Sequence, residues 1–277
     1  MDKMPHIQLD AGIKAVSAIL PGDPARVDAI AEFLTDVREE AFSREYKSIT
    51  GTYKGSRILA ISTGMGGPSA AICVEELANI GIKNIIRIGS CGALQQELSL
   101  GQLVICDRAV CDDGTSQTYL DYFRYASLDY SLDGAAGTKA GIAGTRDGAA
   151  GDMEAICFSC GDDALRQCCV TAAKALQIPW TVGATRCHDA LYLRQKPRLD
   201  EFYSGKGILA SDMETAAIFA VSALRGIRAA SILNVVVEWK RNIGEGISSY
   251  KDGEAATADG EKNEILTALE ALRLAVL

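Results

Sequence analysis

The stretch IIRIGSCGA, residues 85–93, decides the fold. It begins with the apolar run Ile85–Ile88, interrupted only by Arg87, and continues directly into a glycine-containing turn. A short run rich in β-branched residues, bounded by such a turn, is typical of a strand that is covered on both faces. The stretch therefore predicts a buried strand whose far end opens into a turn that carries polar groups.

The same pattern recurs along the chain. Helical patterns separate the short apolar runs, and this alternation predicts an α/β fold with a central, parallel or mixed sheet. No linker interrupts the pattern, so we expect one domain over residues 1–277. The expected strands are 15–20, 58–62, 85–88, 103–110, 181–185 and 230–237, and the expected helices are 24–34, 69–80, 163–176, 212–224 and 261–276.

A Gly/Ala-rich segment at about residues 132–152 departs from the pattern. It reads LDGAAGTKAGIAGTRDGAAGD and contains DGAAG twice. No strand leads directly into it, which favours a surface insertion over a phosphate-binding loop. An insertion of this length could also act as a lid.

Composition excludes several classes of partner. Lys and Arg total 28 against 36 Asp and Glu, and a net charge of −8 argues against a general nucleic-acid or membrane-surface binder. The sequence shows no apolar run of membrane-spanning length and no signal-like N-terminus, so we expect a cytoplasmic protein. The nine cysteines are scattered through predicted core segments, which favours reduced thiols over a disulfide framework.

Three turns at predicted strand ends could together bind an anion. They are PGDPAR at 21–26, TGMGGPS at 63–69 and GSCG at 89–92. Turns of this kind gather at the carboxyl ends of strands, where backbone N–H groups and helix N-termini can hold an anion. Arg26 and Arg87 would add bidentate bonds that suit phosphate, although each arginine taken singly also fits a structural role.

The stretch SDME, residues 211–214, allows two interpretations. Ser-x-x-Glu before an apolar run is the pattern of a capping box, which would start a helix and imply nothing about function. Alternatively, Asp212 and Glu214 belong to a site. His6 and His188 are the only histidines in the chain, so few residues could serve in histidine acid–base chemistry. This favours a reaction driven by positioning and charge stabilisation.

Five motifs occur in the order that is found in a known family. PGDPAR, REY, TGMGGPS, RIGSCGA and SDMETAA resemble the nucleoside phosphorylase family, which includes uridine phosphorylase and the hexameric purine nucleoside phosphorylases. The resemblance implies a mixed, barrel-like sheet flanked by helices. It also implies a homo-oligomer, a hexamer built of dimers, with shared active sites. The implied reaction is phosphate-dependent, reversible cleavage of an N-glycosidic bond, with a nucleoside and inorganic phosphate as substrates and no cofactor.

The resemblance also assigns roles to residues. The catalytic assignments are Arg87, Glu214 and Arg26; the phosphate-binding ones are Gly22, Arg26, Arg44, Arg87 and Ser90; the ribose-binding ones are His6, Met213 and Glu214. Arg44 and His6 would serve the neighbouring subunit. Within SDME, we expect Ser211 to cap the helix, Asp212 to play a supporting part and Glu214 to face the sugar. Glu45 resembles a ligand of a monovalent cation, K⁺, at a subunit interface, and no other metal ligand is assigned.

The base-binding assignments favour uridine phosphorylase. Val236 and Val237 resemble the apolar wall beside uracil, where hexameric purine enzymes carry an aspartate, although Glu238 would be an acid there if the register slipped by one. Gln195 and Arg198 resemble the uracil-reading Gln-x-Arg pair with one extra residue between them, and Arg194 is a competing candidate. The alternatives are a purine nucleoside phosphorylase, a hydrolytic nucleosidase and a non-catalytic nucleoside-binding protein.

Overall fold

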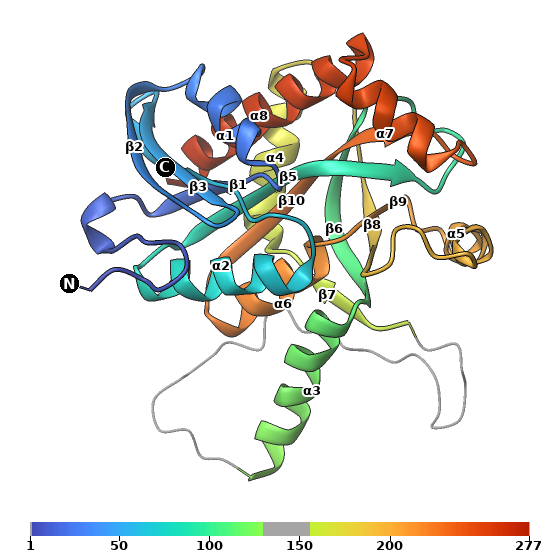
Figure 1. Ribbon diagram of the computed structural model, residues 1–277, viewed down its shortest axis with the longest axis horizontal. Helices are drawn as coiled ribbons and strands as arrows, with labels where there is room; N and C mark the ends of the chain where they lie inside the picture. Colours follow the sequence, from blue (N-terminus) through green and yellow to red (C-terminus); the bar gives the residue numbers. More distant parts are fainter. Residues whose placement is uncertain (1, 130–155, 277) are drawn as a thin grey trace.

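A ten-stranded mixed sheet forms the framework of the protein in the computed structural model (Figure 1). The structure describes residues 2–129 and 156–276. The Gly/Ala-rich segment 132–152 lies outside the described residues. The strands are β1 (Ser17–Leu20), β2 (Thr35–Ser43), β3 (Tyr46–Tyr53), β4 (Ser56–Ile61), β5 (Asn84–Ala93), β6 (Leu103–Asp112), β7 (Phe158–Cys160), β8 (Trp180–His188), β9 (Ala210–Asp212) and β10 (Arg228–Val237).

Five strands close into a barrel. The path β10-β6-β8-β9-β5 returns to its start because β10 also pairs with β5. The β10–β5 pairing is parallel, whereas the β10–β6 pairing is antiparallel. The expected α/β fold with a mixed, barrel-like sheet is thus confirmed.

A second part of the sheet continues from β5 through β1, β4, β3 and β2. The hairpin of β2 and β3 was not predicted from the sequence. Its outer strand, TDVREEAFS, carries several charged residues and is mostly exposed, so it lacks the apolar run that marks the inner strands. Pairing with β3, and not burial, defines this strand.

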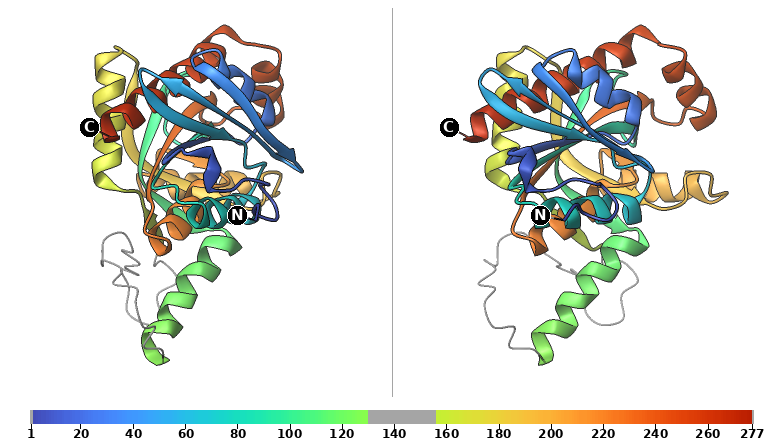
Figure 2. Two further views of the ribbon diagram at one scale, coloured as in Figure 1. Left: turned by 90° about the vertical axis from the view of Figure 1, so that its left-hand side faces the viewer. Right: turned by 60° about the vertical axis from the view of Figure 1, so that its left-hand side comes forward.

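Helices cover the sheet on two sides (Figures 1 and 2). On one side α2 packs against α6, and α6 also contacts α3; on the other side α4 packs against α8, which also contacts β10 and β5. The helices named here are α2 (Gly67–Asn79), α3 (Gly114–Asp129), α4 (Asp163–Ala175), α6 (Thr215–Leu224) and α8 (Ala255–Val276). The other helices are α1 (Pro24–Ala31), α5 (Lys196–Gly205) and α7 (Ile243–Lys251).

The six expected strands and five expected helices are present, but two boundaries were wrong in an informative way. The strand expected at 85–88 continues to Ala93, so the stretch 89–92, expected as a turn, is part of β5. The helix expected from residue 212 begins only at Thr215, because Ala210–Asp212 forms β9 between β5 and β8. The helices α3, α5 and α7 and the short strands β7 and β9 were not predicted. Each of β7 and β9 is three residues long, too short for an apolar periodicity to develop.

Two further expectations bear on the chain as a whole. In the described segments, none of the helices combines the length and the apolar character that crossing a membrane requires. Most cysteines lie in the core as free thiols, as expected: Cys73, Cys91, Cys106, Cys111, Cys169 and Cys187 are free and buried.

Gly101, just before β6, tests how closely α8 packs on the barrel. Its φ is 80°, and a Cβ there would collide with the backbone oxygen of Ala256 at the start of α8. Gly81 has a similar φ of 96° but open space around the Cβ position. We expect Gly81→Ala to lower the free energy of unfolding by about 1–2 kcal/mol, the cost of a left-handed backbone for alanine. Gly101→Ala should lower the free energy of unfolding, measured in urea, by clearly more. Equal losses would show that the α8 contact does not constrain this turn.

Candidate functional site

Strand register brings the sequence motifs to one place. Leu20, the last residue of β1, pairs with Arg87 of β5, so the PGDPAR loop starts beside the RIGSCG stretch. Further along β5, Gly92 pairs with Ser211 of β9, which places SDME against the same strand. Three motifs that are far apart in the sequence thus meet along the carboxyl-terminal half of β5.

The TGMGGPS loop joins them through backbone hydrogen bonds. The amide of Thr63 donates to Pro21 O, and that of Gly64 donates to Gly22 O, at 2.9 Å in both cases. Gly66, at the N-terminus of α2 with φ of 96°, donates its amide to Glu214 Oε1 at 2.6 Å. This loop therefore connects the first motif to the glutamate of SDME.

Arg87 is at the centre of the cluster and is almost completely buried. Its Nε donates to Asp212 Oδ2 at 3.1 Å and its Nη2 to Glu214 Oε2 at 2.5 Å. The guanidinium lies over Gly89, where a Cβ would come within 2.6 Å of Nη2, so a larger residue there would displace the guanidinium. The third nitrogen, Nη1, is buried and has no hydrogen-bond partner among the described residues. A buried cationic donor of this kind suits an anionic ligand.

Asp212, and not Ser211, binds backbone amides at the start of the helix that follows, whose N-cap residue is Glu214. The Oδ2 atom of Asp212 accepts hydrogen bonds from the amides of Glu214 and Thr215 and from the Thr215 hydroxyl. The N-cap is not Ser211, so its expected capping role is wrong, and the supporting role expected of Asp212 in the site stays a prediction. β9 ends only at Asp212, so the helix begins later than expected and its N-cap falls at Glu214.

Glu214 keeps its carboxylate away from the Ser211 amide, as expected. It bonds to Gly66 and Arg87 instead and is almost fully buried. Burial raises the pKa of Glu214, while the adjacent Arg87 charge opposes that rise. A carboxylate has about four lone-pair positions, so it can accept further hydrogen bonds from a ligand.

Arg26 is held by the C-terminal helices, which sequence reasoning did not foresee. Its Nε lies 3.2 Å from Glu261 Oε2, and its Nη1 donates to Glu264 Oε1 at 3.1 Å. Its Nη2 bonds to the hydroxyl of Tyr250 in α7. The one available signal was Glu264 itself, a charged residue within the apolar pattern of the last predicted helix.

The structure places the remaining predicted phosphate residues in two groups. Gly22 is bound to the TGMGGPS loop, and Ser90 is a half-buried residue of β5 next to Gly89. Arg44 is exposed in the turn between β2 and β3, with φ of 56°. No described contact joins Arg44 to Arg26 or Arg87, so its role at an adjacent subunit stays a prediction.

The predicted ribose and cation residues lie on either side of α2. The Nδ1 atom of His6 lies 2.6 Å from Glu76 Oε1, and Glu76 also accepts from the amides of His6 and Ile7. Met213 is half-buried beside Glu214. Glu45 Oε1 accepts a hydrogen bond from Ser69 Oγ at 2.6 Å. These carboxylate and hydroxyl oxygens suit a hard cation, and the cation itself stays a prediction.

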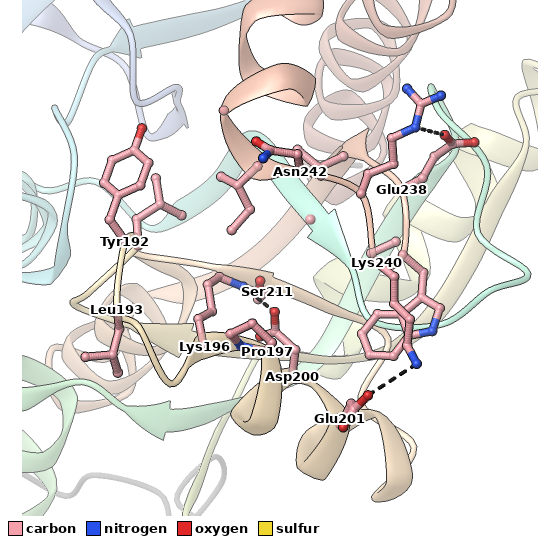
Figure 3. A pocket seen from close by; sticks show the side chains of 18 of the residues that line it. Tyr192, Leu193, Lys196, Pro197, Asp200, Glu201, Ser211, Glu238, Lys240 and Asn242 are labelled. Atoms are coloured by element: carbon pink, nitrogen blue, oxygen red, sulfur yellow. Dashed lines mark hydrogen bonds and ion pairs between the residues drawn. The ribbon is translucent and has the colours of Figure 1, made fainter.

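A pocket of about 550 Å³ opens between α5 and the end of β10 (Figure 3). Leu191, Val237 and Trp239 contribute apolar surface, as do Gly92 and Ala93 of β5. Val237 lines this pocket, as the base assignment expected, whereas Val236 is buried without lining it.

The polar lining of the pocket differs from the predicted one. Gln195 and Arg198 are exposed and do not belong to the lining, whereas Lys196, Asp200 and the competing candidate Arg194 do. Lys196 is buried, and its Nζ donates to Asp200 Oδ2 at 2.6 Å. The extra residue in the Gln-x-Arg pattern marks the point where α5 begins, so the helix turns Lys196 inward and leaves its neighbours exposed.

Arg87 and its two carboxylates generate a stability prediction. Removing the guanidinium in Arg87→Ala leaves two buried carboxylates without their partner, and breaking a buried pair in this way typically costs about 3–5 kcal/mol. Glu214→Gln in the same background removes one of those charges. We therefore expect the double variant to lose less free energy of unfolding than Arg87→Ala alone, as measured in urea. Additive losses would mean that the two side chains are not coupled.

Comparisons with known proteins agree with this geometry. The model of the phosphorylase superfamily matches residues 17–265. The chain is 32% identical to a uridine phosphorylase of Thermococcus kodakarensis, over 97% of this chain and 85% of that protein. It is 36% identical to a DeoD-type 2 purine nucleoside phosphorylase of Vibrio cholerae, over 96% and 98% of the two chains. A crystal structure of uridine phosphorylase from Vibrio fischeri is similar with a TM-score of 0.79 and 32% identity, covering 99% of this chain and 98% of that one. The chain thus belongs to the phosphorylase superfamily, among its nucleoside phosphorylases, which are pentosyltransferases.

Proposed function

We propose that this nucleoside phosphorylase acts on uridine and releases uracil and ribose 1-phosphate. The observation that carries the proposal is the pocket that Gly92 of β5 and Ser211 of β9 help to line, in which the Lys196–Asp200 pair and the apolar Val237 share one lining. Family relatives named for uridine and for purine nucleosides are about equally similar to the chain, so the pocket has to decide between them.

The polar pair suits a base that presents a carbonyl next to an N–H. The Lys196 ammonium has three donors, of which the described structure assigns one to Asp200, so it can donate to a carbonyl oxygen. Asp200 already accepts from Lys196 and, at 3.3 Å, from Arg186 Nη1, and its remaining lone pairs can accept from a ring N–H. Uracil presents this edge at O4 and N3, whereas cytosine presents an amino group and an unprotonated nitrogen. A buried polar site rejects a base that leaves its groups unpaired.

The apolar wall favours a pyrimidine. Val237 contributes no proton donor, so nothing at that position would protonate a purine at N7. The purine alternative rests on Glu238, whose carboxylate also lines the pocket and lies 3.4 Å from Arg241 Nε. Hypoxanthine shares the carbonyl and N–H edge of uracil, so inosine is the competing substrate that the experiment has to include.

The proposed mechanism uses phosphate as the nucleophile at C1′. Arg87, Arg26 and Ser90, with Gly22 and an Arg44 from a neighbouring subunit, would hold phosphate, whose charge stabilises the cationic sugar of the transition state. Glu214 would accept hydrogen bonds from the ribose hydroxyls while Met213 packs on the ring. Such positioning can supply roughly 7–11 kcal/mol of barrier reduction. Inorganic phosphate is the co-substrate in this scheme, and no other cofactor is invoked.

The substrate test measures release of the free base from uridine, cytidine, inosine and adenosine, each with and without phosphate. We expect phosphate-dependent cleavage of uridine and little cleavage of cytidine. Inosine turnover above uridine turnover would favour the purine alternative, and cleavage without phosphate would favour a hydrolytic nucleosidase.

Lys196 is tested by substitution with methionine, which keeps the length and apolar stem but removes the donor. We expect Lys196→Met to lose about 10²-fold or more in kcat/KM for uridine, the order expected when a polar base contact is left unpaired. Arg198→Met is the matched control, because Arg198 is exposed on the same helix and outside the pocket. Equal effects of the two substitutions would remove Lys196 from the base site.

Shared active sites are tested by mixing subunits. The exposed position of Arg44 on the β2–β3 turn agrees with a role in a neighbouring site within a hexamer of dimers. Arg44→Ala and Glu214→Gln should each be inactive alone. Co-assembly should restore up to about one quarter of the activity, because a site that takes each residue from a different subunit escapes both substitutions by chance. No recovery on co-assembly would place both residues in the same subunit's site.

A further inference from the structure

Arg26 is already bound on all three of its nitrogens by α7 and α8. Glu261 lies beside Nε, Glu264 accepts from Nη1, and the Tyr250 hydroxyl lies beside Nη2. A guanidinium carries five N–H donors, so two remain for another ligand. An anion can therefore reach Arg26 only as an additional partner or in exchange for one of these groups.

Glu264 contacts both the arginine and the backbone of the predicted anion site. Its Oε1 accepts from Arg26 Nη1 at 3.1 Å, and its Oε2 accepts from the amide of Gly89 at 3.2 Å. Its exposed fraction is 0%, whereas 25% of the Glu261 side chain is exposed. One fully buried carboxylate near the end of the chain thus holds two elements of the PGDPAR and RIGS motifs together.

The local charge is unfavourable for an anion as the groups stand. Arg26 pairs with Glu261 and Glu264, and Arg87 pairs with Asp212 and Glu214, so four carboxylates surround two guanidinium groups. Adding a phosphate-like anion would increase the excess of buried negative charge, which is costly in a poorly solvated environment. Neutralising one carboxylate would remove part of this cost.

Glu264 is the carboxylate best placed to be neutralised. Asp212 is fixed by its bonds at the start of α6, Glu214 is bound by Gly66 and Arg87, and Glu261 is partly solvated. Burial raises the pKa of Glu264 to about 8, with the charges of Arg26 and Arg87 opposing the rise and Glu261 adding to it. Tyr250 of α7 faces the same cluster, and burial raises its pKa too, so it stays protonated over this range.

We propose that Glu264 is a positioning residue of the anion site, which holds Arg26 and the Gly89 amide in place and carries a proton whenever an anion is bound, a proton that it has to gain during binding at alkaline pH. The proton comes from solvent and forms an O–H bond on Oε1, while Oε2 keeps its bond to Gly89. The bound anion then replaces Glu264 as the counter-ion of Arg26. The inference rests on the phosphate site of the proposed function.

Sulfate is the probe, because it resembles phosphate but does not titrate between pH 6 and pH 10. A group with a raised pKa is ionised only above that pKa, so the proton must be taken up during binding at pH 9 but is already present at pH 6. We expect the sulfate Kd of the wild type to be flat below about pH 7 and to rise above pH 8, toward ~10-fold per pH unit. Calorimetry in two buffers of different ionisation enthalpy should show uptake approaching one proton at pH 9.

Variants separate titration from structure. Glu264→Gln keeps an acceptor for the Gly89 amide and cannot titrate, so it should bind sulfate about as well as the wild type at pH 6, more tightly at pH 9, and without proton uptake. Glu261→Gln is the matched control, one turn earlier on the same helix and beside the same arginine, and should keep the pH dependence. Glu264→Ala lacks the acceptor and should bind sulfate more weakly than Glu264→Gln at every pH.

A pH dependence that persists in Glu264→Gln, or wild-type binding without proton uptake, would overturn the inference. The wild-type calorimetry decides the question if the variant does not fold. Sulfate binding involves no nucleoside, so the two proposals can fail separately. Phosphorolysis of uridine without proton-linked sulfate binding would overturn only the role of Glu264, whereas proton-linked sulfate binding without cleavage of any nucleoside would overturn only the proposed function.

Discussion

The buried ion pairs of Arg87 with Asp212 and Glu214 are the interaction on which the site depends. The arginine projects from β5, which pairs with β1, β9 and β10 and so cannot shift without disturbing most of the sheet. A buried guanidinium is tolerated only where its charge is compensated, and both compensating carboxylates come from SDME. The barrel, the start of α6 and the N-terminus of α2 are therefore fixed relative to one another around this one side chain.

The two arginines of the cluster are held in different ways. Arg87 is bound by Asp212, the last residue of β9, and by Glu214 just after it, and keeps one buried nitrogen without a partner in the described structure. Arg26 is bound on every nitrogen by the C-terminal helices, so its ability to bind an anion depends on the contacts that α7 and α8 make with it. A site assembled from both has one preformed component and one that is coupled to α7 and α8.

The start of α5 decides which side chains of the segment 191–200 line the pocket. The sequence from 191 to 200 suggests a Gln-x-Arg pair, but α5 begins at Lys196 and leaves Gln195 and Arg198 exposed. The helix brings Lys196 and Asp200, one turn apart, to the same side, where they pair. The geometry of α5 thus places Lys196 and Asp200 in the pocket lining, whereas the sequence pattern had indicated their neighbours Gln195 and Arg198.

The sequence by itself determined the α/β class, the six inner strands and the five main helices, because the apolar runs that form them are long enough to show their period. Order and spacing of the short motifs also placed Arg87 and Glu214 in one site. Only the tertiary structure decided that Asp212 binds the first amides of α6, that Lys196 lines the pocket, and that Glu264 holds Arg26 and Gly89. Each of these depends on contacts between residues far apart in the sequence or on the residue at which a helix begins, and local periodicity carries no information about either.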